Sequence, residues 1–434
     1  DPAACLLYAL DILPPSSQQL VVIDARLKTV LATIPLPYFP SDFDISPNGQ
    51  HLVVGYEAPK KISVIDKAQW SIANTITAAT YVHQVEADDN GFVYYGGVSN
   101  WEQTHRIDLS VGTASDMLTG TALLTTPELE LSADGTHLYT GNTGITQAAA
   151  VRYALTNGTA TKDDASIWGE GFGFLDPSPP MLLSPGGQHL YFGGYQLDAQ
   201  DLARVTGATG ERVFAEDAAG TFAVGESDLF DARLALKIAP LPLANPASAA
   251  ALSAGDHELW YSSQQQLYYQ NVADFLAGVP LGVRPRPAAP LDSYNFIKLV
   301  ADPVRPRVYG LDADHQLVVA VDTTSSLAIG GIVVGSRPSD ISVPASGGTL
   351  WISHEGVGAL GKIDLASWQF SGFVPVPIDS DRVAALGDAW VATIDLDQWT
   401  TPTLLDASTG AVVDSLPHQV SEGALCATSD GKIL

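Results

Sequence analysis

Cysteine and positive charge are both scarce in this sequence of 434 residues. It holds 2 cysteines, and its 21 lysines and arginines are outnumbered by 48 acidic residues, so the formal net charge is -27 at pH 7. A chain of this charge repels phosphate backbones and anionic lipid surfaces, so we expect no nucleic-acid partner. No apolar run reaches the roughly 18 residues that a membrane helix needs, so direct membrane insertion is not expected either.

Catalytic and metal-binding motifs are missing as well. The 9 histidines show no His-x-His or His-Glu-x-x-His spacing, and there is no cysteine cluster. The nucleophile motif Gly-x-Ser-x-Gly does not occur. The Gly-rich stretch at 169–174 lacks the strand–helix context that phosphate binding requires. We therefore predict no catalytic residues, no metal and no cofactor, and an enzyme is the less favoured interpretation.

The sequence begins at Asp1 and shows no signal-peptide pattern. We interpret this as a mature form from which a signal has been removed, and we expect a secreted, periplasmic or cell-surface protein. One N-glycosylation sequon occurs, at Asn157-Gly158-Thr159.

The main feature that is present is an internal repeat of about 43 residues. Residues 41–79, 128–159 and 338–377 share one pattern: a short apolar strand, a tight turn, a second strand, a third strand and a β-branched fourth strand. The turns contain Asn-Gly, Asp-Gly or Gly-Gly, whose residues readily adopt φ > 0. The leading apolar residue of the second strand marks ten units: Leu7, Leu52, Val93, Leu138, Leu190, Phe222, Leu259, Val308, Leu350 and Ala389.

Four short strands per repeat predict an all-β fold, a single closed β-propeller over residues 1–434. The chain starts with a second strand, and residues 421–434 have the pattern of a first strand, so one blade is expected to combine 421–434 with 1–39. This pairing would close the ring and remove exposed sheet edges. Cys5 and Cys426 fall in these two strands, so we predict a disulfide between them and an oxidising compartment.

An aspartate recurs at the end of the third strand. One such residue per repeat lies far from the others around a ring, so a shared metal is not expected. We predict instead that each carboxylate caps the following turn by accepting hydrogen bonds from backbone N–H groups. These residues are Asp24, Asp66, Asp108, Asp231, Asp322, Asp364 and Asp406.

The segment SPNGQHLVVGYEAPKKISVIDKAQWSIANTI, residues 46–76, resembles the YVTN-type β-propeller repeat of bacterial and archaeal surface-layer-like proteins. The resemblance covers nearly the whole chain and is clearest over 19–81 and 316–420. It implies a propeller fold but is weak for function, because this blade type occurs in surface proteins, periplasmic sensors and the heavy chains of amine dehydrogenases. Most such propellers have seven blades, so fewer blades than ten, or two smaller propellers with one inserted in the other, remain alternatives.

Two insertions interrupt the repeat, near 167–180 and 282–296. Loops that extend a rigid scaffold commonly carry its binding function, whereas the alternative is an ordinary linker whose arginines balance local acids. The candidate partner-binding residues in and near these loops are Trp168, Phe172, Phe174, Arg284, Arg286, Arg305 and Arg307.

Together these features predict a non-catalytic extracytoplasmic propeller that binds a protein or glycan partner, either alone or as a subunit of a surface or periplasmic assembly. The alternative that the family resemblance implies is an enzyme, or an enzyme heavy subunit of the amine-dehydrogenase type, with a small substrate at the central channel. In that family the redox cofactor lies on another subunit, so missing catalytic motifs do not argue against it.

Overall fold

The computed structural model is an all-β molecule whose strands form ten antiparallel sheets. The single α-helix in the described residues is α1 (Val272–Leu276), and a 3-10 turn covers Leu291–Ser293. The structure describes residues 5–12, 18–97, 103–112, 115–118, 127–142, 150–156, 159–165, 180–241, 245–253, 255, 258–264, 266–277, 284–335, 337–355, 358–376, 378, 380–395, 401–415 and 425.

Consecutive strands pair to form each sheet, apart from a short added strand in one of them. The first sheet holds β1 (Leu6–Asp11), β2 (Gln19–Asp24) and β3 (Thr29–Pro35). The second holds β4 (Asp42–Ile45), β5 (Leu52–Tyr56), β6 (Lys61–Asp66) and β7 (Ser71–Thr77). The third holds β8 (Gln84–Ala87), β9 (Phe92–Gly96), β10 (His105–Asp108) and β11 (Ser115–Met117). The fourth holds β12 (Pro127–Leu131), β13 (His137–Asn142), β14 (Ala150–Thr156) and β15 (Thr159–Ala165).

The next three sheets continue in the same order along the chain. The fifth holds β16 (Leu182–Leu183), β17 (His189–Phe192), β18 (Tyr195–Asp198) and β19 (Asp201–Ala208). The sixth holds β20 (Val213–Glu216), β21 (Phe222–Gly225), β22 (Asp228–Asp231) and β23 (Leu236–Pro240). The seventh holds β24 (Ala249–Leu252), β25 (Glu258–Ser263) and β26 (Gln266–Asn271).

The last three sheets complete the chain. The eighth holds β28 (Phe296–Ala301), β29 (Arg307–Asp312), β30 (Leu317–Asp322) and β31 (Leu327–Val333), with β27 (Pro285–Arg286) added beside β31. The ninth holds β32 (Pro338–Ser342), β33 (Thr349–His354), β34 (Ala359–Asp364) and β35 (Gln369–Pro375). The tenth holds β36 (Arg382–Ala385), β37 (Trp390–Ile394), β38 (Thr403–Asp406) and β39 (Val412–Ser415).

The turn between the first and second strand of a sheet has the geometry that its sequence predicts. Gly49, Gly135 and Gly347 have φ values of 71°, 67° and 66°, a region that favours glycine because it has no Cβ. The second strands lie in the core: all five residues of β5 are buried. Side chains of neighbouring sheets pack between the sheets, as in the cluster that joins β5, β8 and β9.

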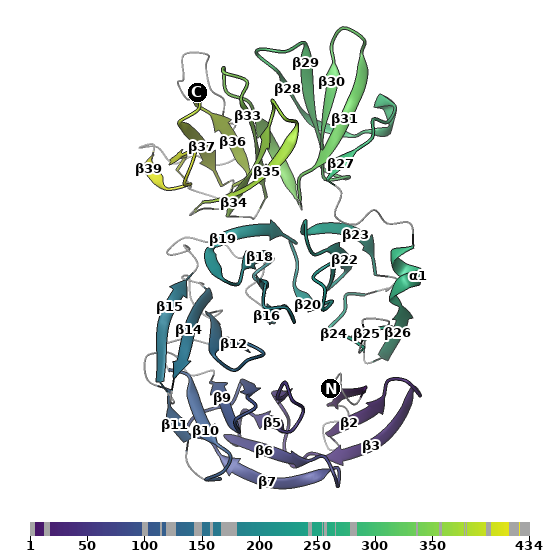
Figure 1. Ribbon diagram of the computed structural model, residues 1–434, viewed down its shortest axis with the longest axis vertical. Coiled ribbons are helices and arrows are strands. Elements are labelled where there is room, and N and C mark those ends of the chain that lie inside the picture. The colour runs from purple at the N-terminus through teal and green to yellow at the C-terminus, as the bar shows by residue number, and fades with distance from the viewer. Residues whose placement is uncertain are drawn as a thin grey trace.

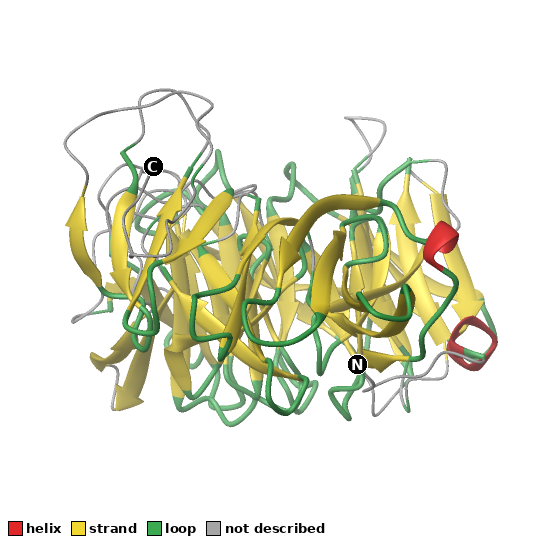
Figure 2. Ribbon diagram, turned by 90° about the horizontal axis from the view of Figure 1, so that it is seen from above, coloured by secondary structure: helices red, strands yellow, loops and turns green. Residues whose placement is uncertain are grey.

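The ten sheets occupy two parts of the molecule. In Figure 1 the first seven sheets, from β1–β3 to β24–β26, follow one another around the lower part, and the last three sheets lie above them. Figure 2 shows loops and turns along the two rims of the molecule, with the strands between them. The first seven sheets are called the lower group below, and the last three are called the upper group.

Side chains and backbone connect the two groups. The backbone N–H of Gly358 donates to Tyr195 Oη at 2.5 Å, and β19 packs against β35. The Arg284 guanidinium donates to the carbonyl oxygens of Val333 at 3.0 Å and Leu234 at 3.1 Å, and it lies 4.0 Å from the centre of the Phe370 ring. Arg284 therefore holds the eighth sheet to the sixth and the ninth.

The predicted all-β fold of repeated antiparallel sheets is confirmed, and it has the sheet arrangement of a propeller. Ring closure by the terminal strands stays a prediction. The N-terminal sheet faces β24–β26 in the lower group, whereas Leu425 packs with Ala384 and Ile394 of the tenth sheet. Cys426 lies outside the described residues.

Within the described part of the chain, no helix is long and apolar enough to cross a membrane.

Candidate functional site

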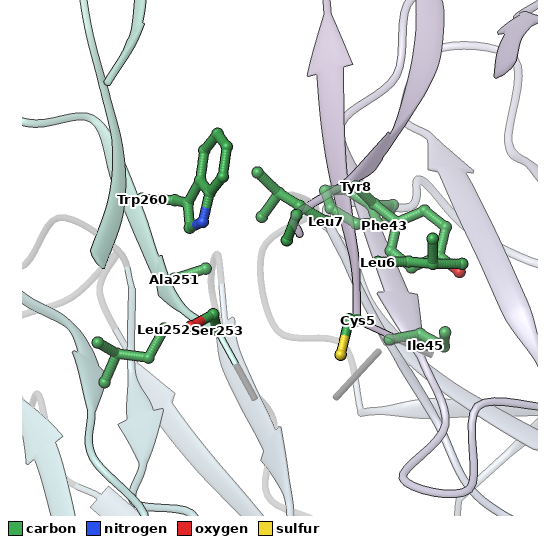
Figure 3. A pocket seen from close by; sticks show the side chains of 11 residues that line it. Cys5, Leu6, Leu7, Tyr8, Phe43, Ile45, Ala251, Leu252, Ser253 and Trp260 are labelled. Carbon is green, nitrogen blue, oxygen red and sulfur yellow. The ribbon is translucent and has the colours of Figure 1, made fainter. Parts of the chain in front are cut away.

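A cleft separates the sheets β1–β3 and β24–β26, which are far apart in the sequence. Two adjoining hollows of about 190 and 410 Å³ share Leu7, Tyr8, Phe43, Ala251 and Trp260. Figure 3 shows Leu7 and Trp260 on opposite sides of the gap, with Cys5 on the same wall as Leu7. The cleft is thus mainly apolar. Its remaining lining residues include Leu6, Ala9, Leu10, Ala25, Asp42, Ile45, Ser248, Ala249, Ala250, Leu252, Ser253, Tyr261, Ser262 and Leu267.

The hollow exists because one of its walls carries small side chains. The β24 sequence is Ala-Ala-Ala-Leu, and Ala251 pairs across the sheet with Trp260. Trp260 is 5% exposed and packs against Tyr269, with ring centres 5.2 Å apart. The indole Nε1–H is buried and has no hydrogen-bond partner within the described residues. A buried donor of this kind gains free energy from an acceptor that comes within hydrogen-bond distance of it.

A charged contact joins the two sheets beside the cleft. Lys28 Nζ lies 2.9 Å from Glu258 Oε1 and 3.8 Å from the centre of the Tyr269 ring. The hydrogen bond from Lys28 to Glu258 raises the pKa of the lysine above its ordinary value. The turn residue Lys28 thereby connects the sheet β1–β3 to the sheet β24–β26.

A second cluster lies on the inner strands of three successive sheets. Asp42 and Asp44 on β4, Glu86 on β8, and Glu128 and Glu130 on β12 occur at alternate positions, so those on one strand point to the same side. Asp42 accepts from Val85 N at 3.0 Å, Asp44 from Ala87 N at 2.7 Å, and Glu86 from Leu131 N at 3.3 Å. We call this set the inner carboxyl ladder.

Gln84 belongs to the same pattern. Its side-chain oxygen accepts from Leu129 N and its amide nitrogen donates to Glu128 Oε2, each at 2.5 Å. Each inner strand therefore binds the backbone of the next through side chains two residues apart. Glu128 and Glu130 continue the series by accepting from the backbone N–H groups of Met181 and Leu183, at the fifth sheet.

The ladder carboxyls hold protons more strongly than isolated acids do. Burial raises the pKa of Asp42 to about 6, of Asp44 to about 7 and of Glu128 to about 8. Burial, together with repulsion from Asp44, also raises the pKa values of Glu86 and Glu130 well above their usual range. Within the described residues, no group of three or more His, Cys, Asp or Glu side chains has the geometry to hold a metal ion.

The seven recurring aspartates are the last residues of β2, β6, β10, β22, β30, β34 and β38. Asp24 Oδ1 accepts from the backbone N–H groups of Arg26 at 2.9 Å and Leu27 at 2.8 Å. Asp406 Oδ1 accepts from those of Ser408 and Thr409, both at 2.9 Å. Asp66, Asp108, Asp231, Asp322 and Asp364 make equivalent turn contacts.

The loop arginines chosen from the sequence do not gather at one surface. Arg284 is held between sheets, as described above. Arg305 Nη1 donates to Asp302 Oδ2 and to the Gly347 carbonyl oxygen, both at 2.9 Å. Arg286, on β27, and Arg307, at the start of β29, are half-buried. At Arg284 and Arg305 the structural role is therefore the observed one. Trp168, Phe172, Phe174, Asn157 and Cys426 lie outside the described residues.

Sequence reasoning missed both the cleft and the ladder. A signal for the ladder was present, because the pairs Asp42/Asp44, Gln84/Glu86 and Glu128/Glu130 lie seven and five residues before Gly49, Gly91 and Gly135. No comparable signal pointed to Trp260, whose aromatic position is shared by most repeats.

Comparison with known proteins adds little to these observations. No family model matches this chain, and no curated protein matches it. Among solved structures, hydrazine synthase from Kuenenia stuttgartiensis is similar over 90% of this chain and 90% of that chain, with 10% sequence identity and a TM-score of 0.34. At that identity and score the likeness carries no argument about what this chain does.

Proposed function

We propose that this chain is a non-catalytic binding module that acts outside the cytoplasm, and that its partner is a protein that inserts apolar side chains into the cleft between β1–β3 and β24–β26. The observation that carries this proposal is the buried indole N–H of Trp260, which lies without an acceptor beside the hollow opposite Leu7. Concave, mainly apolar sites with a few polar groups are typical of binding sites.

The chemistry of the walls favours a protein over a glycan. A glycan brings many hydroxyl groups, each of which needs a hydrogen-bond partner when it leaves water. The cleft offers mainly Leu, Ala, Ile and aromatic side chains. Its polar groups are three serines, Asp42, Cys5, the hydroxyl groups of Tyr8 and Tyr261, and the Trp260 indole N–H. A polypeptide supplies apolar side chains together with backbone carbonyl oxygens, and one such oxygen satisfies Trp260.

A selection with two kinds of probe tests the proposal. Wild-type protein is screened against a phage-displayed library of linear peptides and against a glycan array. The same screens use Ala251→Phe, which fills the hollow, and Val412→Phe, a control at an exposed position on β39. We expect peptides that bind wild type and the control but lose at least tenfold in affinity for Ala251→Phe. Binding of glycans alone, or peptide binding that ignores Ala251→Phe, would overturn the proposal.

We also propose that residues 421–434 supply the missing first strand of the sheet that holds β1–β3, and that Cys426 bonds to Cys5. The repeat pattern of this segment supports the first part, as does Leu425, which is buried against the tenth sheet. Mass mapping of unreduced peptides from the native protein tests the second. A Cys5–Cys426 peptide would place the two termini together. Two free thiols would instead favour a seven-sheet ring that closes between β24–β26 and β1–β3.

A further inference from the structure

The inner strands β4, β8 and β12 bring five carboxyl groups together. The charged groups that act most strongly on these carboxyls are other carboxyls, and no lysine, arginine or histidine is among them. Repulsion from Asp44 acts on Glu86 and Glu130, and repulsion from Asp42 acts on Glu86, Glu128 and Glu130. Glu128 is fully buried and the other four are half-buried. Five like charges in such a place cannot all persist, because each one loses hydration and repels the others.

The second strands beside the ladder also carry titratable side chains, and several of these bind groups outside the ladder. Tyr95 Oη accepts from Ala79 N, and Tyr139 Oη donates to the Ala199 carbonyl oxygen. His137 and His189 lie beside Asp163 and Glu216. The remaining titratable groups on these neighbouring second strands are Tyr56, Tyr94 and Tyr191, and none is a base at neutral pH.

Protonation suits the hydrogen bonds that the ladder makes. A carboxyl group has two oxygens, and the bond to the next strand uses one of them as an acceptor of a backbone N–H. The second oxygen can carry a proton without breaking that bond. Asp42 and Asp44 also accept from the backbone N–H groups of Phe43 and Ile45, which favour the charged form, but burial has the larger effect on their pKa values. Glu128 Oε1 is buried without a hydrogen-bond partner in the described residues, so a negative charge there would stay uncompensated. A neutral acid avoids this cost.

We propose that the inner carboxyl ladder is a proton-binding site that is occupied at neutral pH, and that proton release at higher pH loosens the inner contacts between the sheets β4–β7, β8–β11 and β12–β15. The raised pKa values of Asp42, Asp44 and Glu128 place this release between about pH 6 and 8. Because the five groups interact, their protons leave in steps that belong to the cluster and not to single residues.

Infrared spectroscopy of the full chain measures the protons directly. We expect the C=O stretch of protonated carboxyl groups at pH 6, and we expect its amplitude to fall as the pH rises to 9. Glu86→Gln and Glu130→Gln should each reduce its amplitude, whereas Asp66→Asn, at an exposed turn, should leave it unchanged. A wild-type spectrum without this band at pH 6 would overturn the proposal even if every variant failed to fold.

Hydrogen exchange of the wild-type protein tests the structural consequence. Ala87 N–H and Leu131 N–H donate to the ladder, so their peptides should lose at least tenfold protection between pH 6 and 9 after correction for intrinsic rates. The matched control is the peptide around Val383, whose N–H donates to Asp340 at 3.3 Å. Equal changes in both regions would contradict the proposal. So would a requirement for added calcium to keep β8 and β12 protected, because the ladder would then hold a cation.

Discussion

The inner strands β4, β8 and β12 of the lower group and β28, β32 and β36 of the upper group share one design but differ in their charges. Positions equivalent to Asp42, judged by pairing with the second strand, are Gln84 and Glu128 in the lower group. In the upper group they are Lys298, Asp340 and Arg382. Asp340 accepts from Val383 N as Asp42 accepts from Val85 N, but Lys298 Nζ also lies 2.8 Å from Asp340 Oδ1.

The difference shows two solutions to the burial of an acid. In the upper group a lysine neutralises Asp340, whose side chain is 2% exposed. In the second to fourth sheets of the lower group, carboxyl groups lie next to one another, and their raised pKa values take the place of a counter-charge. The hydrogen bond to the next sheet thus forms whichever way the charge is balanced. The dependence of stability on pH, in contrast, is set by how the charge is balanced.

The largest expected effect is a loss of stability of the whole molecule with rising pH. Ladder carboxyls have raised pKa values when folded, so the folded protein binds more protons than the unfolded chain. Their stabilising effect is complete below about pH 4 and is lost as the pH rises through 6 to 8. The free energy of unfolding should fall by about 1.4 kcal/mol per pH unit for each proton that the folded state binds and the unfolded state does not. Solvent screening of the half-buried carboxyl groups makes the fall smaller. Urea titrations at pH 5 and pH 8.5 measure it, and equal values would contradict the assignment.

Removing the counter-charge in the upper group should have the next largest effect. Lys298→Met leaves Asp340 buried and unpaired, and we expect a loss of about 2 kcal/mol at pH 7, below the full range for buried pairs because Lys298 is partly exposed. Lys298→Arg is the matched control and should retain most of the stability. The double variant Lys298→Met/Asp340→Asn should recover part of the loss. Full loss in the double variant would show that packing, and not charge, explains the effect.

Giving the lower group the charge pattern of the upper group should have a smaller effect. Gln84→Lys places a cation between Asp42 and Glu128, at the position that Arg382 occupies in the tenth sheet. We expect a gain of about 1 kcal/mol at pH 8.5, a loss of the bond to Leu129 N, and a shallower dependence of stability on pH. Gln84→Glu, which adds a like charge, should make that dependence steeper. A Lys variant with the wild-type pH profile would argue against repulsion as the cause.

Removal of a turn-capping aspartate should have the smallest effect on stability, and the effect should be the same in both groups. Asp66 and Asp364 each accept from the backbone N–H groups of exposed turns. Replacement of either by Ala should lower Tm by about 1–3 °C, because water takes over the freed N–H groups. Thermal melts of the two variants measure this. Unequal shifts would show that the two groups unfold separately.

The local parts of this fold were predictable from the sequence, and the long-range parts were not. Hairpin turns such as Asn48-Gly49 and the caps at Asp66 and Asp364 depend on a few neighbouring residues, so the repeat pattern reveals them. The ladder required alignment of the repeats position by position. The cleft depends on which distant sheets face each other, and no local pattern pairs Leu7 with Trp260.

The ladder also bears on how a repeat array changes during evolution. Asp42, Asp44 and Glu86 bind the backbone N–H groups of the next inner strand, which every residue except proline provides. A duplicated or exchanged sheet would therefore meet its neighbour with this contact already satisfied, whatever side chains it carries. Gene duplication can lengthen such an array one unit at a time, and the inner side chains remain free to acquire new charge patterns afterwards.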